Sequence, residues 1–217
     1  GLYSDISSVE IDTYLAETAA ALTVEHPDYS YLAARIKVNS LHKETPGFII
    51  ATKNLYDDGL LREEYFKKVM ENADAIESII DYDKDYTFDY FALTTLIRAY
   101  LLKFDNRTIE RPQDLWMRVT LTVTGNEFNL DKIKETYKSL SSGMYTHATP
   151  TLFNSGLKMQ QLSSCFLIGM EDDSIEGIFN TIKDCALISK TAGGIGMHAH
   201  NIRGSGSRIK STNGKSN

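Results

Sequence analysis

The chain has 217 residues, of which 42% are hydrophobic, and a formal net charge of −6 at pH 7. At roughly 100–200 residues per domain, this length allows one large or two small domains, and the acidic balance argues against general nucleic-acid binding. The sequence has no apolar run of about 18 residues and no signal-peptide pattern at its start, so we expect a cytoplasmic protein without a membrane-spanning segment. Its two cysteines are too few for a disulfide framework or a zinc cage.

The first part of the chain has the apolar periodicity of helices. A helix is predicted over residues 7–24, where Ser7 and Glu10 have the spacing of a capping box. A second helix is predicted over 28–43, because Pro27 suits the first turn of a helix. The residues expected to face a core are Val9, Leu15, Ala19 and Leu22 in the first helix, and Leu32, Ile36 and Leu41 in the second.

Shorter helices are expected in the middle of the chain. Two or three are predicted over 48–80, a short or mixed helix over 91–102, one from Arg111 onward and one over 129–142. The expected core residues here are Leu115, Trp116, Val119 and Val123. The acidic and aromatic segment 81–86 lacks the glycine and the terminal glutamate of a calcium loop, so we expect it to be a solvated loop.

From residue 147 onward the pattern changes. Residues 147–151 are predicted to be extended, because Pro150 disfavours the helical conformation at Thr149. A strand, a helix and a second strand then follow at 162–168, 174–190 and 195–202. This order suggests two parallel strands joined by a crossover helix, and ligands of such units bind at the carboxyl ends of the strands.

Several polar residues of this region admit a structural and a functional interpretation. Cys165, next to Ser164 on the first strand, is either a small core residue or a redox thiol, and its position alone favours the core. Asp173 is either the N-cap of the helix, with Glu176 at the third position, or an acceptor for a sugar hydroxyl, and the cap is favoured. Cys185 on the helix is expected to be packed.

The segments after this helix are rich in glycine and basic residues. Gly193 and Gly194 are expected to end the helix and turn into the second strand. His198 and His200 share one strand face, but without a third ligand nearby we expect no metal site. Residues 203–217 contain four basic residues and no acidic one, which suits a small anion such as a nucleotide phosphate.

Eight segments match the sequence words of one protein family. They are GLYS at 1–4, HPDY at 26–29, LHKET at 41–45, ERPQ at 110–113, THATPTLFN at 146–154, QLSSCFL at 161–167, DDSIEG at 172–177 and CALISKTAGGIG at 185–196. Together they resemble the large, catalytic subunit of class I ribonucleotide reductase of the eukaryotic type. The resemblance covers nearly the whole chain.

This resemblance implies an α/β fold in which a mostly helical N-terminal domain precedes the first strands of a ten-stranded α/β barrel. The implied domains are a remnant of the ATP-cone helices at 1–45, a helical domain at 46–146 and the start of the barrel at 147–217. The thiyl-radical cysteine and the rest of the barrel are expected to follow residue 217. The chain is therefore expected to be a fragment that does not turn over substrate by itself.

The family reduces ribonucleoside diphosphates to deoxyribonucleotides by a thiyl-radical mechanism. By resemblance, Cys165 is the redox cysteine at the substrate and ends in a disulfide with a later cysteine, while Thr149 and Ser164 contact the substrate. The implied allosteric effector-binding residues are Asp173, Ser174, Ile175, Lys190, Arg203, Lys210 and Ser211. The family commonly has Ala-Gly where this chain has Lys210 and Ser211. Ser8 and Asp12 are expected to remain from an overall-activity site.

The resemblance also implies partners and cofactors. A separate small subunit would carry the radical metallocofactor, magnesium would accompany the nucleotides, and this chain would bind no cofactor or metal itself. The expected ligands are a ribonucleoside diphosphate substrate and the effectors dNTP and ATP, with a homodimer formed through the helix at 174–190. The alternative is a non-catalytic nucleotide-sensing dimerisation module, for which Cys165 would be dispensable.

Overall fold

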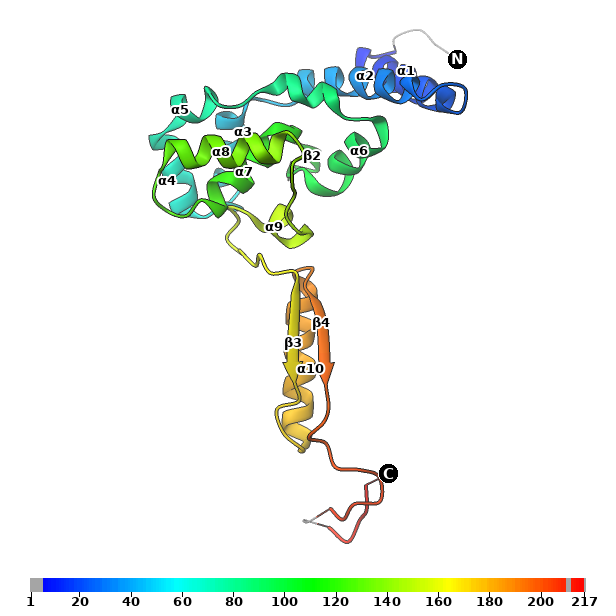
Figure 1. Ribbon diagram of the computed structural model, residues 1–217, viewed down its shortest axis with the longest axis vertical. Coiled ribbons are helices and arrows are strands. Elements are labelled where there is room, and N and C mark those ends of the chain that lie inside the picture. The colour runs from blue at the N-terminus through cyan, green and yellow to red at the C-terminus, as the bar shows by residue number, and fades with distance from the viewer. Residues whose placement is uncertain (1–5, 210–211, 217) are drawn as a thin grey trace. The chain divides into compact units, whose positions relative to one another are not determined.

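The computed structural model describes residues 6–209 and 212–216 (Figure 1). Lys210 and Ser211, two predicted effector contacts, lie outside these described residues. The chain divides into two compact units, the first formed by Gly1–His147 with Leu152–Gln160, and the second by Ala148–Thr151 with Gln161–Asn217. Each unit is described by itself.

The first unit is helical, as the sequence predicts. Its elements are α1 (Ser8–Ala21), η1 (Leu22–Val24), α2 (Asp28–Glu44), α3 (Phe48–Asp57), α4 (Glu63–Glu71), α5 (Ala73–Glu77), η2 (Tyr82–Thr87), α6 (Tyr90–Thr95), the π-helix η3 (Leu96–Tyr100), α7 (Pro112–Val123) and α8 (Leu130–Ser141). A short antiparallel hairpin, β1 (Lys103–Phe104) and β2 (Arg107–Thr108), stands between η3 and α7. A further helix, α9 (Thr149–Asn154), follows α8.

Helices α1 and α2 pair along their length (Figure 1). The predicted capping box is present, because Ser7 Oγ accepts a hydrogen bond from the backbone N–H of Glu10, whose carboxylate accepts one from the N–H of Ser7. The predicted core stripe is partly wrong, since Val9, Leu15 and Leu32 are exposed. The buried apolar residues of the pair are Ala16, Ala19, Ala33, Ala34, Val38 and Leu41. Small side chains let the two helices approach closely, which a search for large apolar residues does not detect.

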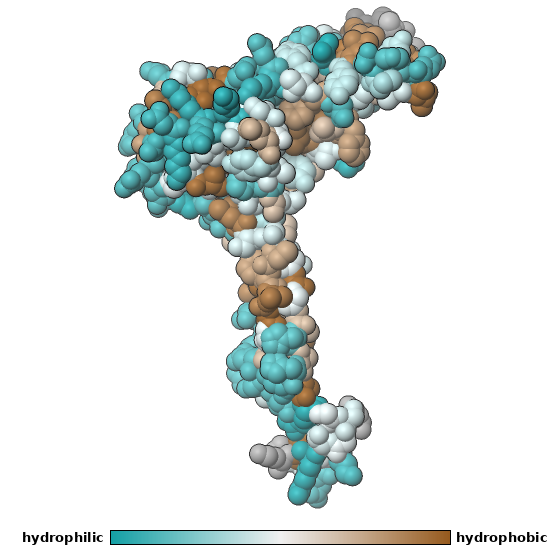
Figure 2. Space-filling view, viewed as in Figure 1, coloured by the Kyte–Doolittle hydropathy of each residue, from teal (hydrophilic) through white to brown (hydrophobic). Residues whose placement is uncertain are grey.

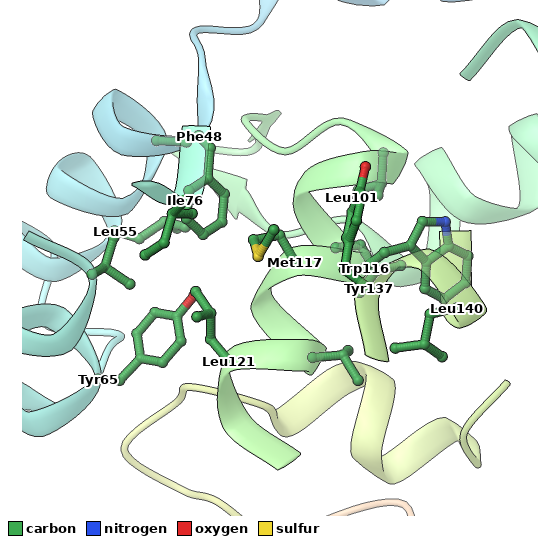
Figure 3. Packing of buried hydrophobic residues seen from close by; sticks show 14 of the residues in the cluster. Phe48, Leu55, Tyr65, Ile76, Leu101, Trp116, Met117, Leu121, Tyr137 and Leu140 are labelled. Atoms are coloured by element: carbon green, nitrogen blue, oxygen red, sulfur yellow. The ribbon is translucent and has the colours of Figure 1, made fainter. Parts of the chain in front are cut away.

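The main core surrounds α7. Figure 3 shows Met117 and Leu121 of α7 between side chains from α3, α4 and α5 and those of α8. Of the predicted core residues, Leu115, Trp116 and Val119 are buried, whereas Val123 is half-buried. Each large apolar side chain buried here contributes about 1.5–3 kcal/mol to stability. Pro112 begins the helix at the position where a missing N–H costs least.

The segment predicted to be a solvated loop instead supplies a buried carboxylate. Residues 82–87 form η2, and Asp85 is completely buried. His42 Nε2 lies 2.7 Å from Asp85 Oδ2, and the N–H of Gln113 donates to Asp85 Oδ1. Burial raises the pKa of Asp85, and its hydrogen bonds with His42 and Gln113 oppose that shift. Alternating aspartates in a sequence suggest a solvated loop. The hydrogen-bond partner of Asp85, His42, lies far away in sequence on α2.

A second buried carboxylate, Asp114 on α7, makes stability depend on pH. Asp114 accepts hydrogen bonds from Tyr82 Oη at 2.7 Å and from the N–H of Arg111 at 2.8 Å. Burial nevertheless raises the pKa of Asp114 to about 7. The folded state therefore keeps a proton that the unfolded chain releases above about pH 4.

We expect the free energy of unfolding to fall between about pH 4 and pH 7, because unfolding releases this proton and higher pH favours its release. The slope due to Asp114 is at most about 1.4 kcal/mol per pH unit, and it vanishes above about pH 7. Urea unfolding of the wild type and of Asp114→Asn across this range measures it. Parallel curves for the two proteins would contradict the assignment.

The second unit has the predicted parallel strand–helix–strand order. Strand β3 (Cys165–Gly169) pairs with β4 (Gly194–His198) from Cys165 opposite Gly194 to Gly169 opposite His198, and α10 (Ile175–Lys190) connects them. Figure 1 shows α10 along one face of the two strands. Both strands are shorter than predicted, since the segments 162–164 and 199–202 lie outside them.

Two local predictions for this unit are corrected. Thr149 is the first residue of α9 rather than extended, because Pro150 is tolerated within the first turn of a helix. The left-handed residue after α10 is Ala192, with φ of 63°, and not a glycine. Gly193 is needed because there is no room for a side chain at this position. A Cβ there would lie 2.7 Å from Ile188 Cγ2 and 2.9 Å from Phe166 Cε2.

Candidate functional site

The N-terminus of α10 is capped by Ser174, not by Asp173 as predicted. Ser174 has extended backbone angles, and its Oγ accepts a hydrogen bond from the N–H of Gly177 at 3.0 Å. The Ser174 hydroxyl in turn donates to Asp172 Oδ1 at 2.5 Å. Gly177 packs so closely against Asp172 that a Cβ would clash with it. Serine is among the preferred N-caps, so Asp173 remains available for another partner.

That partner is Arg203, thirty positions later in the chain. Its Nε donates to Asp173 Oδ2 at 2.5 Å, and its Nη2 donates to the backbone oxygen of Asp173 at 2.9 Å. Each of the two side chains is about one-third exposed. The pair therefore ties the basic segment after β4 to the N-terminus of α10 while leaving both charged groups open to a ligand.

A pocket of ≈ 430 Å³ opens between these two segments. Asp173, Ser174 and Arg203 form part of its polar lining. Its apolar lining consists of Ile175, Ile178, Ile202 and Ile209. Its volume lies in the range of about 300–1,000 Å³ that is typical of small-molecule sites.

The pocket combines a helix N-terminus with a guanidinium group. The N-terminal N–H groups of a helix carry partial positive charge, and arginine forms paired hydrogen bonds to phosphate oxygens. The isoleucines offer an apolar wall on which a flat ring can lie. A small molecule with an anionic end and an apolar ring matches this arrangement, whereas a duplex nucleic acid does not.

Four of the predicted effector residues meet in this pocket: Asp173, Ser174, Ile175 and Arg203. Lys190 does not, because it ends α10 and is roughly 22 Å from Ile175 along the axis, at a rise of about 1.5 Å per residue. Sequence reasoning missed the apolar lining residues Ile202 and Ile209. Their only signal was that Ile202 precedes the basic, glycine-rich segment and Ile209 lies within it.

Cys165 lies at the start of β3 and is a free, exposed thiol. The core position favoured by its sequence context is therefore wrong: Phe166 and Ile168 are half-buried toward α10, and Cys165 is on the other face. A Cβ on Gly194 would lie 3.2 Å from the backbone oxygen of Ser164 and in ordinary contact, at 3.7 Å, with Cys165 Sγ. Cys185 is half-buried on α10.

The predicted substrate residues lie in segments joined to the start of β3. Thr151 Oγ1 donates to the backbone oxygen of Leu162 at 2.9 Å. This bond connects the first turn of α9, which contains Thr149, to the segment that leads into Ser164 and Cys165. Ser164 is exposed and Thr149 is half-buried. The catalytic and substrate-binding roles of these residues stay predictions.

The remaining predicted residues are Ser8 and Asp12, assigned to an overall-activity site, and the pair His198 and His200. Asp12 on α1 accepts a hydrogen bond from Lys43 Nζ of α2 at 3.0 Å, and Ser8 is exposed at the start of α1. Lys43 is a neighbour that sequence reasoning missed, although it lies in the LHKET segment. His198 Nδ1 and His200 Nδ1 are 2.7 Å apart. Among the described residues, no group of three or more His, Cys, Asp or Glu side chains is placed to hold a metal ion.

The part of the chain that the structure describes includes no helix long and apolar enough to cross a membrane.

Comparisons with known proteins identify the class. A family model described as "Ribonucleotide reductase, all-alpha domain" matches residues 86–160, and one described as "Ribonucleotide reductase, barrel domain" matches residues 163–217. The two models follow each other along the chain, and together they show that the chain contains ribonucleotide reductase domains. The domain bounds predicted from the sequence stay predictions.

Curated relatives narrow the class to one subunit. The chain is 47% identical to "Ribonucleoside-diphosphate reductase large chain 2" of Saccharomyces cerevisiae, and 46% identical both to the large chain of Schizosaccharomyces pombe and to the large subunit of Arabidopsis thaliana. Each alignment covers 100% of this chain and 26%, 28% and 28% of the respective relative. The chain therefore belongs to the ribonucleotide reductase large-subunit family, and it spans about a quarter of the length of these relatives.

Proposed function

We propose that this chain contributes a nucleotide-effector site and a redox cysteine to a ribonucleoside-diphosphate reductase, an oxidoreductase of deoxyribonucleotide biosynthesis. The observation that carries the proposal is the pocket in which Asp173, Ser174, Ile175 and Arg203 meet. These residues were singled out by family resemblance from sequence, and their side chains converge on one hollow of suitable size and charge. Membership of the large-subunit family supplies the reaction class.

The proposed effector is a deoxynucleoside triphosphate or ATP, accompanied by magnesium. Arg203 and the N-terminus of α10 would bind phosphate oxygens, and the isoleucine wall would contact the base. Asp173 accepts hydrogen bonds only, so its carboxylate would receive one from a sugar hydroxyl. Lys210 and Ser211 are proposed to contribute from the same basic segment.

The proposed chemistry at Cys165 is a two-electron reduction. A thiyl radical on another cysteine of the enzyme abstracts the 3′ hydrogen of the ribose, and the 2′ hydroxyl leaves as water. Cys165 and a partner thiol supply two electrons and two protons, which leaves a disulfide between the two sulfurs. The cysteine that abstracted the hydrogen atom then returns it to C3′ and becomes a thiyl radical again. The exposed thiol on the face of β3 away from α10 supports this role, with Thr149 and Ser164 as substrate contacts. A separate small subunit would supply the radical.

We further propose a homodimer through α10. Ile175, Phe179 and Ile182 are exposed along the helix, and brown, hydrophobic surface is visible on this unit in Figure 2. If two copies pair with their α10 helices antiparallel, the C-terminal end of one helix lies beside the N-terminal end of the other. Lys190 of the second copy would then lie near the pocket of the first copy, although it lies far from the pocket of its own chain.

A non-catalytic nucleotide-sensing module is the second candidate. It is favoured by one observation: a pocket lined by Asp173, Ser174 and Arg203 already forms within one chain. The two candidates differ in whether Cys165 is required for a reaction.

Effector binding tests the proposal. We expect dTTP to bind the 217-residue chain saturably in isothermal titration calorimetry, and Arg203→Gln to weaken it at least about tenfold, because a charged hydrogen bond is lost. Asp173→Ala should weaken dTTP more than it weakens tripolyphosphate, because only dTTP has the sugar hydroxyl. Asp184→Ala, an exposed acid on the same helix outside the pocket, is the matched control.

An increase of dTTP affinity in Asp173→Ala would contradict the assignment of its carboxylate to the sugar. Equal affinities of the wild type, Arg203→Gln and Asp184→Ala would remove the pocket from the proposal altogether.

A further inference from the structure

A larger hollow, of ≈ 520 Å³, lies in the first unit, apart from the residues that the family resemblance assigns. Helix α2, the π-helix η3 and strand β2 enclose it. Its lining residues are Lys37, Ser40, Leu41 and Glu44 of α2, Ile97 of η3, and Arg107 and Thr108 of β2. A second hollow of ≈ 220 Å³ shares the lining residues Glu44, Arg107 and Thr108 with the first.

The local structure explains why these residues gather. The four residues from α2 are spaced three and four apart, which places them on one face of the helix. The turn between β1 and β2 has left-handed backbone angles at Asp105 and Asn106, with φ of 48° and 61°. Asn and Asp adopt this conformation more readily than other side chains. The turn reverses the chain tightly, and Arg107 follows it directly.

The three charged side chains of the hollow have no ion-pair partner in the part of the chain that the structure describes. Lys37, Arg107 and Glu44 form no ion pair with another described residue, although charged neighbours such as Lys43 do. Ser40, which is only 2% exposed, also lines the hollow.

We propose that this hollow, named here the α2–hairpin pocket, binds a small sugar phosphate. Lys37 and Arg107 supply two cations for the phosphate group, and arginine can bind two phosphate oxygens at once. The Glu44 carboxylate would repel a bare phosphate but accepts hydrogen bonds from sugar hydroxyls. Leu41 and Ile97 provide an apolar wall for the carbon skeleton. The combination of two cations, one carboxylate and a buried hydroxyl selects a ligand that has an anionic end and donor hydroxyls.

Calorimetric titration of the 217-residue chain with ribose 5-phosphate tests this inference. We expect saturable binding that Arg107→Gln and Lys37→Gln each weaken at least about tenfold. Arg35→Gln, which removes an exposed cation of α2 outside the pocket, should leave the affinity unchanged. Because the replaced cations make no internal ion pair, the variants should unfold at the same temperature as the wild type, and a thermal scan checks this.

The sugar is tested separately from the phosphate. Glu44→Gln should weaken ribose 5-phosphate but not inorganic phosphate, and ribose alone should bind more weakly than ribose 5-phosphate in every variant. Absence of saturable binding would overturn the proposal, as would equal affinity of wild type and Arg107→Gln. Binding lost in Arg203→Gln but kept in Arg107→Gln would also overturn it, since the ligand would then occupy the pocket beside α10.

Discussion

Arg118→Met is expected to lower the free energy of unfolding by about 3–5 kcal/mol, because it leaves a buried carboxylate without its partner. Arg118 Nε donates to Glu110 Oε1 at 2.6 Å, with side-chain exposures of 2% and 3%. Arg118 Nη1 also donates to the backbone oxygens of Leu152 and Ser155. One substitution therefore removes the charge partner and two links from α7 to the segment around α9.

Urea unfolding followed by fluorescence measures this effect. The chain has a single tryptophan, and Trp116 lies on α7 two positions from Arg118, so its emission reports on this core. Lys67→Met is the matched control, because it breaks the exposed pair of Lys67 with Glu63 and should change stability little. A second substitution, Glu110→Leu, should restore part of the loss from Arg118→Met. Equal stability of Arg118→Met and Lys67→Met would show that the buried pair does not form.

Cys165→Ser is expected to abolish ribonucleotide reduction in a full-length large subunit that contains this sequence, while leaving dTTP affinity unchanged. Serine keeps the size of the side chain, but it cannot supply the electrons that form a disulfide. Turnover of a ribonucleoside diphosphate with small subunit and reductant measures the first effect, and calorimetry measures the second.

The second cysteine provides the matched control for Cys165→Ser. Cys185→Ser should retain turnover, since Cys185 is a half-buried thiol on α10 and has no proposed part in the reaction. Full turnover in Cys165→Ser would support the nucleotide-sensing module instead. Loss of dTTP binding would indicate a structural defect, because Cys165 does not line the effector pocket.

Helix positions were predictable because their signals are local. The capping box of Ser7 and Glu10 begins α1, and Pro112 begins α7. Which face of a helix is buried was less predictable, because that depends on the neighbouring helix. The α1–α2 pair packs through alanines, and the buried Asp85 is hydrogen-bonded to His42, which lies 43 positions earlier. Neither contact has a signal within a short window of sequence.

The candidate effector site was predictable only where its residues adjoin one another. Asp173, Ser174 and Ile175 form one sequence word and line one pocket. Their individual tasks were assigned less well, since Ser174 and not Asp173 caps the helix. Two residues of similar capping preference stand side by side there, and only the path of the chain decides between them. Ile202 and Ile209 depend on how the segment after β4 folds back, which no periodicity encodes.

The two-stranded sheet also bears on how this protein behaves in solution. Among the described residues, β3 and β4 pair only with each other, so each strand leaves its outer row of N–H and C=O groups without a strand partner. On the face away from α10, Leu167 is 93% exposed. Open edges beside an apolar face are templates for further strands. A chain with these edges open carries a site for self-association, and the fraction that stays soluble should fall as its concentration rises.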